Sequence, residues 1–268
     1  MHIRKPSFLV GNDGRYTRRI FEQLGLPPEE FDRIAAEADR GAMNLGAWCG
    51  PKEEVSAEPL SGAETDRFVQ ELTARGELAT RLMRTVAAMH GRERWGFKIL
   101  GDVIHADTYA EVWPEATMIL LVRDPRDHAL SVMKLNKQRE ARGQPNFYDD
   151  YPSVARGWCE TIGEGLEAIR SSGLRYLVVR YEDLIGDTDN ELQRLSDKLD
   201  IDLSRGREFH KADFIAVHTS RFKHHDNLKR PINSESLEKW RSQMSDADVG
   251  IFSEIAGALM QQYGYSIR

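Results

Sequence analysis

Short apolar runs alternate with longer segments of helical periodicity along the chain. Four runs have the length and the branched or aromatic content of buried strands, over residues 7–10, 95–100, 118–122 and 174–179. Elsewhere apolar residues recur every three or four positions, which predicts helices over 16–24, 29–40, 64–90 with a break near Gly76, 103–112, 154–169, 189–199 and 246–263. Residues 134–152 are polar, and we expect a surface excursion there. This alternation implies an α/β fold with a central parallel sheet and helices on both faces.

Composition narrows the class of protein without naming a reaction. The chain has 268 residues and a net charge of −6, which argues against a non-specific nucleic-acid binder but leaves room for a local basic cleft. Its two cysteines, Cys49 and Cys159, are too few for a disulfide framework, and we interpret both as free thiols. No apolar stretch has the length of a signal peptide or of a membrane span, so we expect a soluble cytoplasmic protein.

The junction after the strand over 118–122 is the first candidate for chemistry. The apolar run stops at Arg123, and a helix is expected to follow with Asp124 as its cap and Pro125 at its first position. Ser131 lies about two turns along this helix, on roughly the same side as the cap. Backbone N–H groups, the helix dipole and a guanidinium converge there, which predicts an anion site. The alternative is a strand-to-helix junction whose charges are merely solvated.

The same junction resembles a known family. The run Arg123-Asp124-Pro125-Arg126-Asp127, with Ser131 eight positions after the arginine, is similar to the 3′-phosphate-binding segment of sulfotransferases that use 3′-phosphoadenosine 5′-phosphosulfate (PAPS). The resemblance implies that the arginine and the serine grip the 3′-phosphate of the cofactor.

Two later segments carry the resemblance further. Arg180–Leu184, RYEDL, is similar to a family segment at the end of a strand, which implies that Tyr181 lies near the adenine. We expect its two acidic residues to act as structural caps and not as metal ligands. Lys229-Arg230 and Trp240-Arg241 resemble the family's basic loop and the helix after it, which implies that Arg230 is a further phosphate contact.

The first loop departs from the family pattern. A strand, a glycine-rich turn and a helix form the layout of a phosphate-cradling loop, and in this family that loop holds the 5′-phosphosulfate. The expected Gly-Thr-Thr core is missing, and either Arg15 or Gly14 can be aligned with the basic position. The candidate contacts in this loop are Gly11, Gly14, Arg15, Thr17 and Arg18. The alternative is an ordinary turn with a solvated arginine cluster.

The strand over 95–100 is expected to supply catalytic groups. Lys98 resembles the family's strand lysine, but Leu100 occupies the place where one branch of the family has its catalytic histidine. Asp102 and His105 are the nearest candidates for a general base, which must reach the acceptor and titrate near the working pH. The alternatives are a helix cap for Asp102 and a helix-surface histidine for His105.

The resemblance implies one sulfotransferase-like domain over 1–268, of the fold related to P-loop NTPases, with a helical acceptor-side insertion at about 25–92. It implies transfer of a sulfuryl group from PAPS to a hydroxyl or amine of a small molecule or glycan, with PAP (3′-phosphoadenosine 5′-phosphate) as product and no metal. Lys98 and Arg15 would stabilise the charge of the transferred group. Two alternatives stay open: a non-catalytic relative that binds a nucleotide or a partner, and a P-loop kinase, which lacks its G-x-x-x-x-G-K-[ST] signature here.

Overall fold

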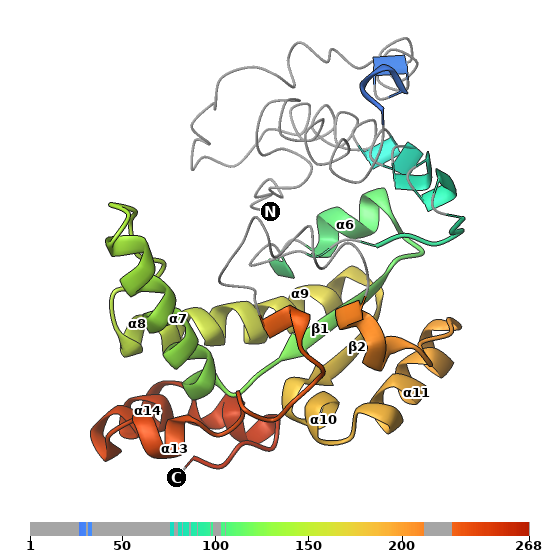
Figure 1. Ribbon diagram of the computed structural model, residues 1–268. Helices are drawn as coiled ribbons and strands as arrows, with labels where there is room; N and C mark the ends of the chain where they lie inside the picture. The colour runs from blue at the N-terminus through green and yellow to red at the C-terminus, as the bar shows by residue number, and fades with distance from the viewer. Residues whose placement is uncertain are drawn as a thin grey trace. The chain divides into compact units, whose positions relative to one another are not determined.

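The computed structural model describes residues 27–30, 32–33, 76–77, 80–81, 83–85, 87–89, 91–96, 98, 103–104, 106–211 and 227–267 (Figure 1). The chain divides into two compact units, which are described separately. The first unit contains residues 1–116 and 165–175, and the second contains 117–164 and 176–268.

The second unit holds most of the described secondary structure. Its elements in chain order are β1 (Thr117–Val122), α7 (Pro125–Glu140), α8 (Tyr151–Cys159), a π-helical turn (Glu160–Glu164), β2 (Arg175–Arg180), α10 (Tyr181–Gly186), α11 (Thr188–Leu199), a 3-10 segment (Gly206–Lys211), α13 (Trp240–Gln243) and α14 (Asp246–Gln262). Among the described residues, β1 and β2 pair as a small parallel sheet.

Three helices of the second unit bury a common apolar core. Helices α7, α8 and α14 contact one another, as Figure 1 also shows. Val154 of α8 and Phe252 and Met260 of α14 are completely buried, and Trp158 meets the ring of Tyr263 edge-on with 6.5 Å between centroids. This core fixes the side of α7 that does not face the candidate site.

Strand β1 is buried on one face only. Leu120 and Val122 are buried, whereas Ile119 and Leu121 are 51% and 52% exposed. Alternate side chains of a strand point to opposite faces, so the apolar run that predicted a fully buried strand here has one covered and one open face.

Two predicted boundaries in this unit need correction. Helix α7 continues to Glu140, so only residues 141–150 form the excursion that was expected over 134–152. The predicted helix over 154–169 is interrupted by the π-helical turn, after which α9 (Gly165–Ser172) begins.

Two helices of the first unit, α6 (Ala106–Val112) and α9, pack on each other. A Cβ added to Gly165 would lie 2.6 Å from a methyl group of Val103, so the glycine permits a close approach. Gly76 is helical and buried against the side chain of Val112, and the residues beside 76–77 at which a break near Gly76 was predicted lie outside the described ones.

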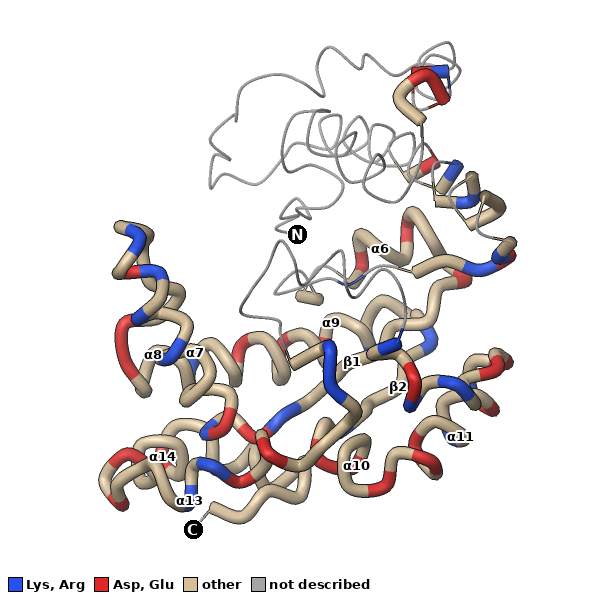
Figure 2. The backbone as a smooth tube through the Cα atoms, viewed as in Figure 1, with Lys and Arg blue, Asp and Glu red and all other residues tan. Residues whose placement is uncertain are grey.

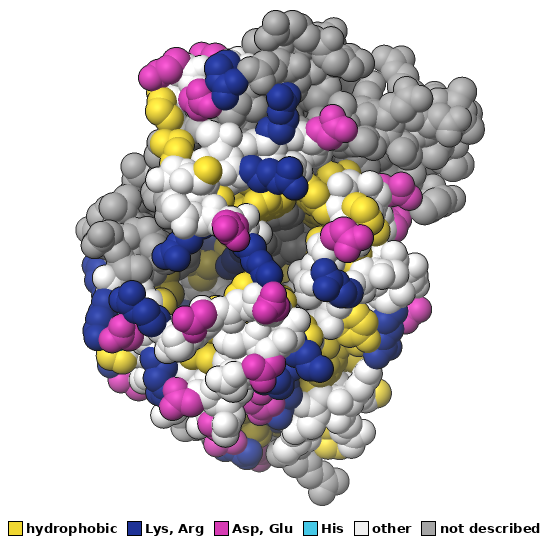
Figure 3. Space-filling model, turned by 90° about the vertical axis from the view of Figure 1, so that its right-hand side faces the viewer, with side chains coloured by type: hydrophobic (Ala, Val, Ile, Leu, Met, Phe, Trp, Pro, Cys, Tyr) yellow, Lys and Arg dark blue, Asp and Glu magenta, His cyan; other side chains and the backbone are white. Residues whose placement is uncertain are grey.

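The described residues form a mixed, helix-rich α/β structure. Trp95, Gly96 and Lys98 lie in no strand, contrary to the prediction for 95–100, and the strand expected over 7–10 lies outside the described residues. No helix of the described residues is long and apolar enough to cross a membrane. Lys and Arg alternate with Asp and Glu along the described chain (Figure 2), and both signs are mixed over the face shown in Figure 3.

Candidate functional site

The N-terminus of α7 forms as its local sequence predicts. The Asp124 side chain accepts a hydrogen bond from the backbone N–H of Arg126 at 2.9 Å, and Pro125 occupies the first helical position. These two residues stop the strand and start the helix within three positions, which places Arg123 between β1 and α7. The prediction of a capped helix start is confirmed.

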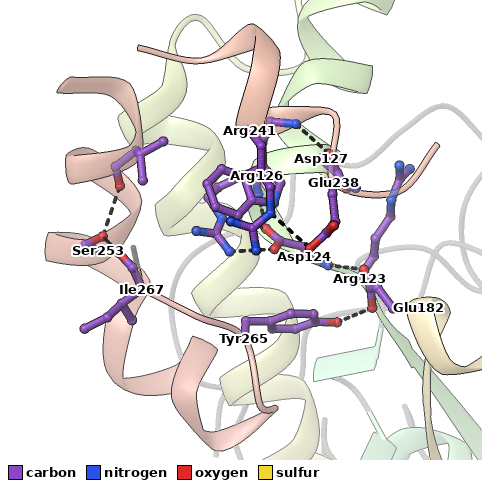
Figure 4. A network of polar contacts seen from close by, with 12 residues as sticks. Arg123, Asp124, Arg126, Asp127, Glu182, Glu238, Arg241, Ser253, Tyr265 and Ile267 are labelled. Atoms are coloured by element: carbon purple, nitrogen blue, oxygen red, sulfur yellow. Dashed lines mark hydrogen bonds and ion pairs between the residues drawn. The ribbon is translucent and has the colours of Figure 1, made fainter. Parts of the chain in front are cut away.

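Arg126 is buried beneath this junction and does not reach solvent. Its Nε and Nη2 donate to the two carboxylate oxygens of Asp124 at 3.0 and 2.7 Å, and the side chain of Arg126 is 1% exposed. Its guanidinium carbon also lies 3.5 Å from the ring centroid of Trp240, the first residue of α13. The pair therefore ties the start of α7 to α13 (Figure 4).

Asp127 makes a second tie to the same region. Its Oδ2 accepts from the backbone N–H of Glu238 at 2.7 Å, and its Oδ1 accepts from the backbone N–H of Trp240 at 3.0 Å. Burial raises the pKa of Asp127, against the opposing effects of these hydrogen bonds and of the Arg123 charge. Both carboxylate oxygens of Asp127 therefore accept hydrogen bonds from backbone N–H groups.

Glu182 links the junction to the C-terminal region. One carboxylate oxygen accepts from the backbone N–H of Asp124 at 2.9 Å, and the other accepts from the Tyr265 hydroxyl at 2.7 Å (Figure 4). Burial raises the pKa of Tyr265, and the hydrogen bond to Glu182 adds to the rise. Glu182 therefore bridges three distant segments, where the sequence suggested only a local cap.

Arg123 is held in place from several directions. Its Nη2 donates to the carbonyl oxygen of Ser236 at 2.7 Å, and its own carbonyl oxygen accepts from Trp158 Nε1 at 3.0 Å. The guanidinium carbon lies 4.8 Å from the centroid of the Tyr181 ring, and the Tyr181 hydroxyl shares a hydrogen bond of 2.9 Å with Ser236 Oγ. The Arg123 Nε is buried and has no hydrogen-bond partner among the described residues.

A pocket of about 630 Å³ in the second unit brings four predicted residues together. These cofactor-binding candidates are Arg123, Ser131, Tyr181 and Arg230. Two further cations, Lys134 and Lys239, also line the pocket. Its apolar wall is formed by Leu130, Leu184, Ile185, Leu192 and Phe209. The lining therefore combines four cationic side chains with apolar ones, and it also contains the carboxylates of Asp127 and Glu235.

The exposed guanidinium of Arg230 already has a partner in the pocket wall. It forms two hydrogen bonds to the carboxylate of Glu235, at 2.9 and 2.5 Å, and this pair stands open to solvent. An anion that uses Arg230 has to share it with this carboxylate.

Of the remaining predicted site residues, the structure describes Lys98 alone. Lys98 belongs to the first unit and is exposed. Seven candidates lie outside the described residues: Gly11, Gly14, Arg15, Thr17, Arg18, Asp102 and His105. Within the described ranges, no group of three or more His, Cys, Asp or Glu side chains has the arrangement of a metal site.

The structure adds site residues that the sequence reasoning missed. Lys134 lies three residues after Ser131 and seven after Asp127, so helical spacing alone places it on the pocket face. His128, next to Asp127 in the first turn of α7, does not line the pocket, and its pKa is lowered by burial and by the charge of Arg123. Ser236 has no local signal, because its role depends on contacts with Arg123 and with Tyr181 of α10.

The described part of the chain thus has a strand-to-helix junction with a fixed arginine, beside a pocket that four cationic side chains line. The sequence model described as the sulfotransferase family matches residues 27–205, which is more than half of the chain. The chain belongs to the sulfotransferase family. Comparison with curated proteins and with solved structures found no match.

Proposed function

We propose that this protein transfers a sulfuryl group from PAPS to a hydroxyl or amine of a small-molecule or glycan acceptor. Membership of the sulfotransferase family supports the reaction class. The observation that carries the cofactor assignment is the pocket itself, because Arg123, Ser131, Tyr181 and Arg230 line it together. With Lys134 and Lys239, four cationic side chains line the pocket, which favours a ligand that carries phosphate groups.

The residues of the pocket fit such a cofactor. Arg123 and Ser131 would hold a phosphate, with Arg230 as a further contact and Tyr181 near the adenine. The apolar wall suits a purine, because pockets for nucleotides combine apolar surface with a few convergent polar groups. When bound, PAPS supplies the sulfuryl group.

We propose the remaining roles from the family resemblance. Lys98 and Arg15 would stabilise negative charge that develops during transfer, as fixed cations do in preorganised sites. Asp102 or His105 would take the proton of the acceptor. The loop with Gly11, Gly14, Arg15, Thr17 and Arg18 would hold the 5′ end of the cofactor, without a metal.

We propose that the fold implied by the family resemblance extends over the whole chain. The sheet of β1 and β2 would belong to a larger central parallel sheet between two helical layers, in one sulfotransferase-like domain over 1–268. Residues 25–92 would form an insertion on the acceptor side. A cytoplasmic location stays a prediction from the sequence.

Thermal unfolding with PAP, with ATP and without ligand tests the cofactor assignment. A ligand that binds only the folded state stabilises it by about 2.7 kcal/mol at one hundred times its dissociation constant. We expect PAP to raise the midpoint of the wild type and to have little effect on Arg123→Ala. Arg139→Ala is the control, because Arg139 lies near the C-terminal end of α7, bonds the Pro145 carbonyl and does not line the pocket.

Two results would contradict the proposal. If PAP does not shift the wild-type midpoint, the pocket is not a PAPS site. If ATP and PAP shift it equally, the kinase alternative gains support. PAP binding without sulfuryl transfer from PAPS to a panel of alcohols and amines would favour the non-catalytic alternative.

A further inference from the structure

We propose that Asp127 is a positioning residue for the anion site, acting through the 236–240 segment. This inference rests on the proposed function and deepens it, because it explains how Arg123 is aimed. Asp127 would hold the segment by its backbone, and the segment would orient Arg123 through Ser236.

The first step is the grip of Asp127 on the segment. Asp127 is 3% exposed and stands in the first turn of α7, a fixed point of the second unit. Its two oxygens accept the backbone N–H groups of Glu238 and Trp240, which are charge-assisted hydrogen bonds. These hydrogen bonds fix the position of the backbone at Glu238 and Trp240 and do not depend on the side chains of those residues.

The backbone of the segment needs to be held. Glu238 has a φ of +54°, in the left-handed region that residues other than glycine rarely adopt. A strained conformation of this kind persists only where the surrounding structure determines it. The N–H of this same residue is one of the two that Asp127 accepts.

The second step leads from the segment to the site. Ser236 precedes Glu238 by two residues, and its carbonyl oxygen accepts from Arg123 Nη2 while its hydroxyl meets Tyr181. These contacts fix the guanidinium, with Nη2 used and Nε left without a described partner. Movement of the segment would release Arg123 and Tyr181 together.

Asp127 also borders the pocket, so a simpler role has to be separated from positioning. A carboxylate that merely lies near a bound phosphate repels it, and its neutralisation would strengthen binding. A positioning carboxylate has the opposite effect, because its loss frees the segment. The sign of the change in affinity therefore distinguishes the two roles.

The test compares PAP with adenosine 5′-phosphate, which lacks the 3′-phosphate, by calorimetric titration at a temperature where every variant is folded. We expect Asp127→Asn to weaken PAP binding about tenfold, the effect of one lost charge-assisted hydrogen bond, and to weaken adenosine 5′-phosphate binding much less. Asp150→Asn is the matched control, because Asp150 also accepts a helix N-terminal N–H, from Ser153, but does not line the pocket.

A second variant covers the case in which Asp127→Asn does not fold. Ser236→Ala alters a half-exposed side chain and removes only the contact with Tyr181, so we expect a loss of PAP affinity of about two- to threefold. Unchanged or tighter PAP binding in Asp127→Asn would overturn the positioning role while wild-type PAP binding upholds the cofactor site. If the wild type binds no PAP, both proposals fail.

Discussion

Arg126→Ala should destabilise the protein far more than an ordinary arginine substitution. The guanidinium is buried, and two of its nitrogens donate to the Asp124 carboxylate. Removing it would leave that carboxylate buried with one remaining donor, the backbone N–H of residue 126. Removing one partner of a buried ion pair costs about 3–5 kcal/mol, because the other charge is left uncompensated.

Two further contributions adjust this magnitude in opposite directions. The contact of Arg126 with the Trp240 ring, at 3.5 Å, adds to the loss, since a desolvated cation–π contact contributes about 2 kcal/mol. The Arg126 Nη1 has no hydrogen-bond partner among the described residues, so its removal relieves a cost of about 1–3 kcal/mol. The lost cation–π contact and the relieved cost of Nη1 nearly cancel. We therefore expect Arg126→Ala to lower the free energy of unfolding by about 3 kcal/mol or more.

The chain offers a matched control on the same indole ring. Arg241 lies 4.4 Å from the Trp240 centroid, but its side chain is 51% exposed and its partner, Glu238, is 64% exposed. Arg241→Ala should therefore cost less than about 1 kcal/mol, the range of exposed ion pairs.

Urea unfolding followed by far-ultraviolet circular dichroism measures both changes without relying on the fluorescence of the perturbed indole. The free energy of unfolding follows from the midpoint and the slope of each curve. A loss of less than about 1 kcal/mol for Arg126→Ala would refute the view that this buried pair holds α7 to α13. Equal losses in the two variants would refute it as well.

Three smaller predictions concern the same unit. Ser245→Ala removes the capping box of α14 and should cost about 1 kcal/mol in urea unfolding, so no change would contradict the cap. Gly157→Ala puts a Cβ 2.5 Å from the Tyr148 hydroxyl and should cost about 1–3 kcal/mol; a neutral result would mean that the tyrosine moves freely. Burial and the charge of Arg123 lower the pKa of His128 below its usual 6.5, so the unfolded chain binds the proton first. Stability should fall as the pH drops below that value, less so in His128→Gln, and parallel pH profiles of the two proteins would contradict this.

Local sequence signals predicted the parts of the site that depend on neighbouring residues. Asp124 and Pro125 marked the start of α7 because a cap and a first-turn proline act within one turn. The apolar run before them predicted β1, and the run over 174–179 predicted β2 within one residue. Arg123 and Ser131, which the motif spacing paired, line the same pocket, and their binding role stays a prediction.

Contacts between distant segments were not accessible to the same reasoning. Asp127 looked like a first-turn charge for the helix dipole, but its partners lie 111 and 113 residues away. Glu182 looked like a local cap, although its two partners are 58 and 83 residues away. Nothing in the periodicity of the chain signals such a pairing, and three of these four bonds come from backbone N–H groups, which every residue except proline carries.

The predicted helix over 154–169 shows a different limit. Its four marker residues, Trp158, Ile162, Leu166 and Ile169, are all buried, as expected. Residues spaced four apart do not stay on one line of an α-helix, because the helix has 3.6 residues per turn. The π-helical turn at Glu160–Glu164 has more residues per turn, and it lies between the first marker residues and the last ones. The regular pattern of apolar residues therefore predicted correctly which residues are buried. It did not predict that a π-helical turn interrupts the helix.

The bond between Arg123 and the Ser236 carbonyl has a consequence for the order of folding. It closes a loop of 113 residues, and the chain must lose the entropy of that closure before the bond can form. Helix α7 and its cap, in contrast, use contacts within a few residues and can assemble early. The protein should thus acquire its helices before it acquires a competent anion site, so refolding followed by circular dichroism should finish ahead of refolding followed by ligand binding.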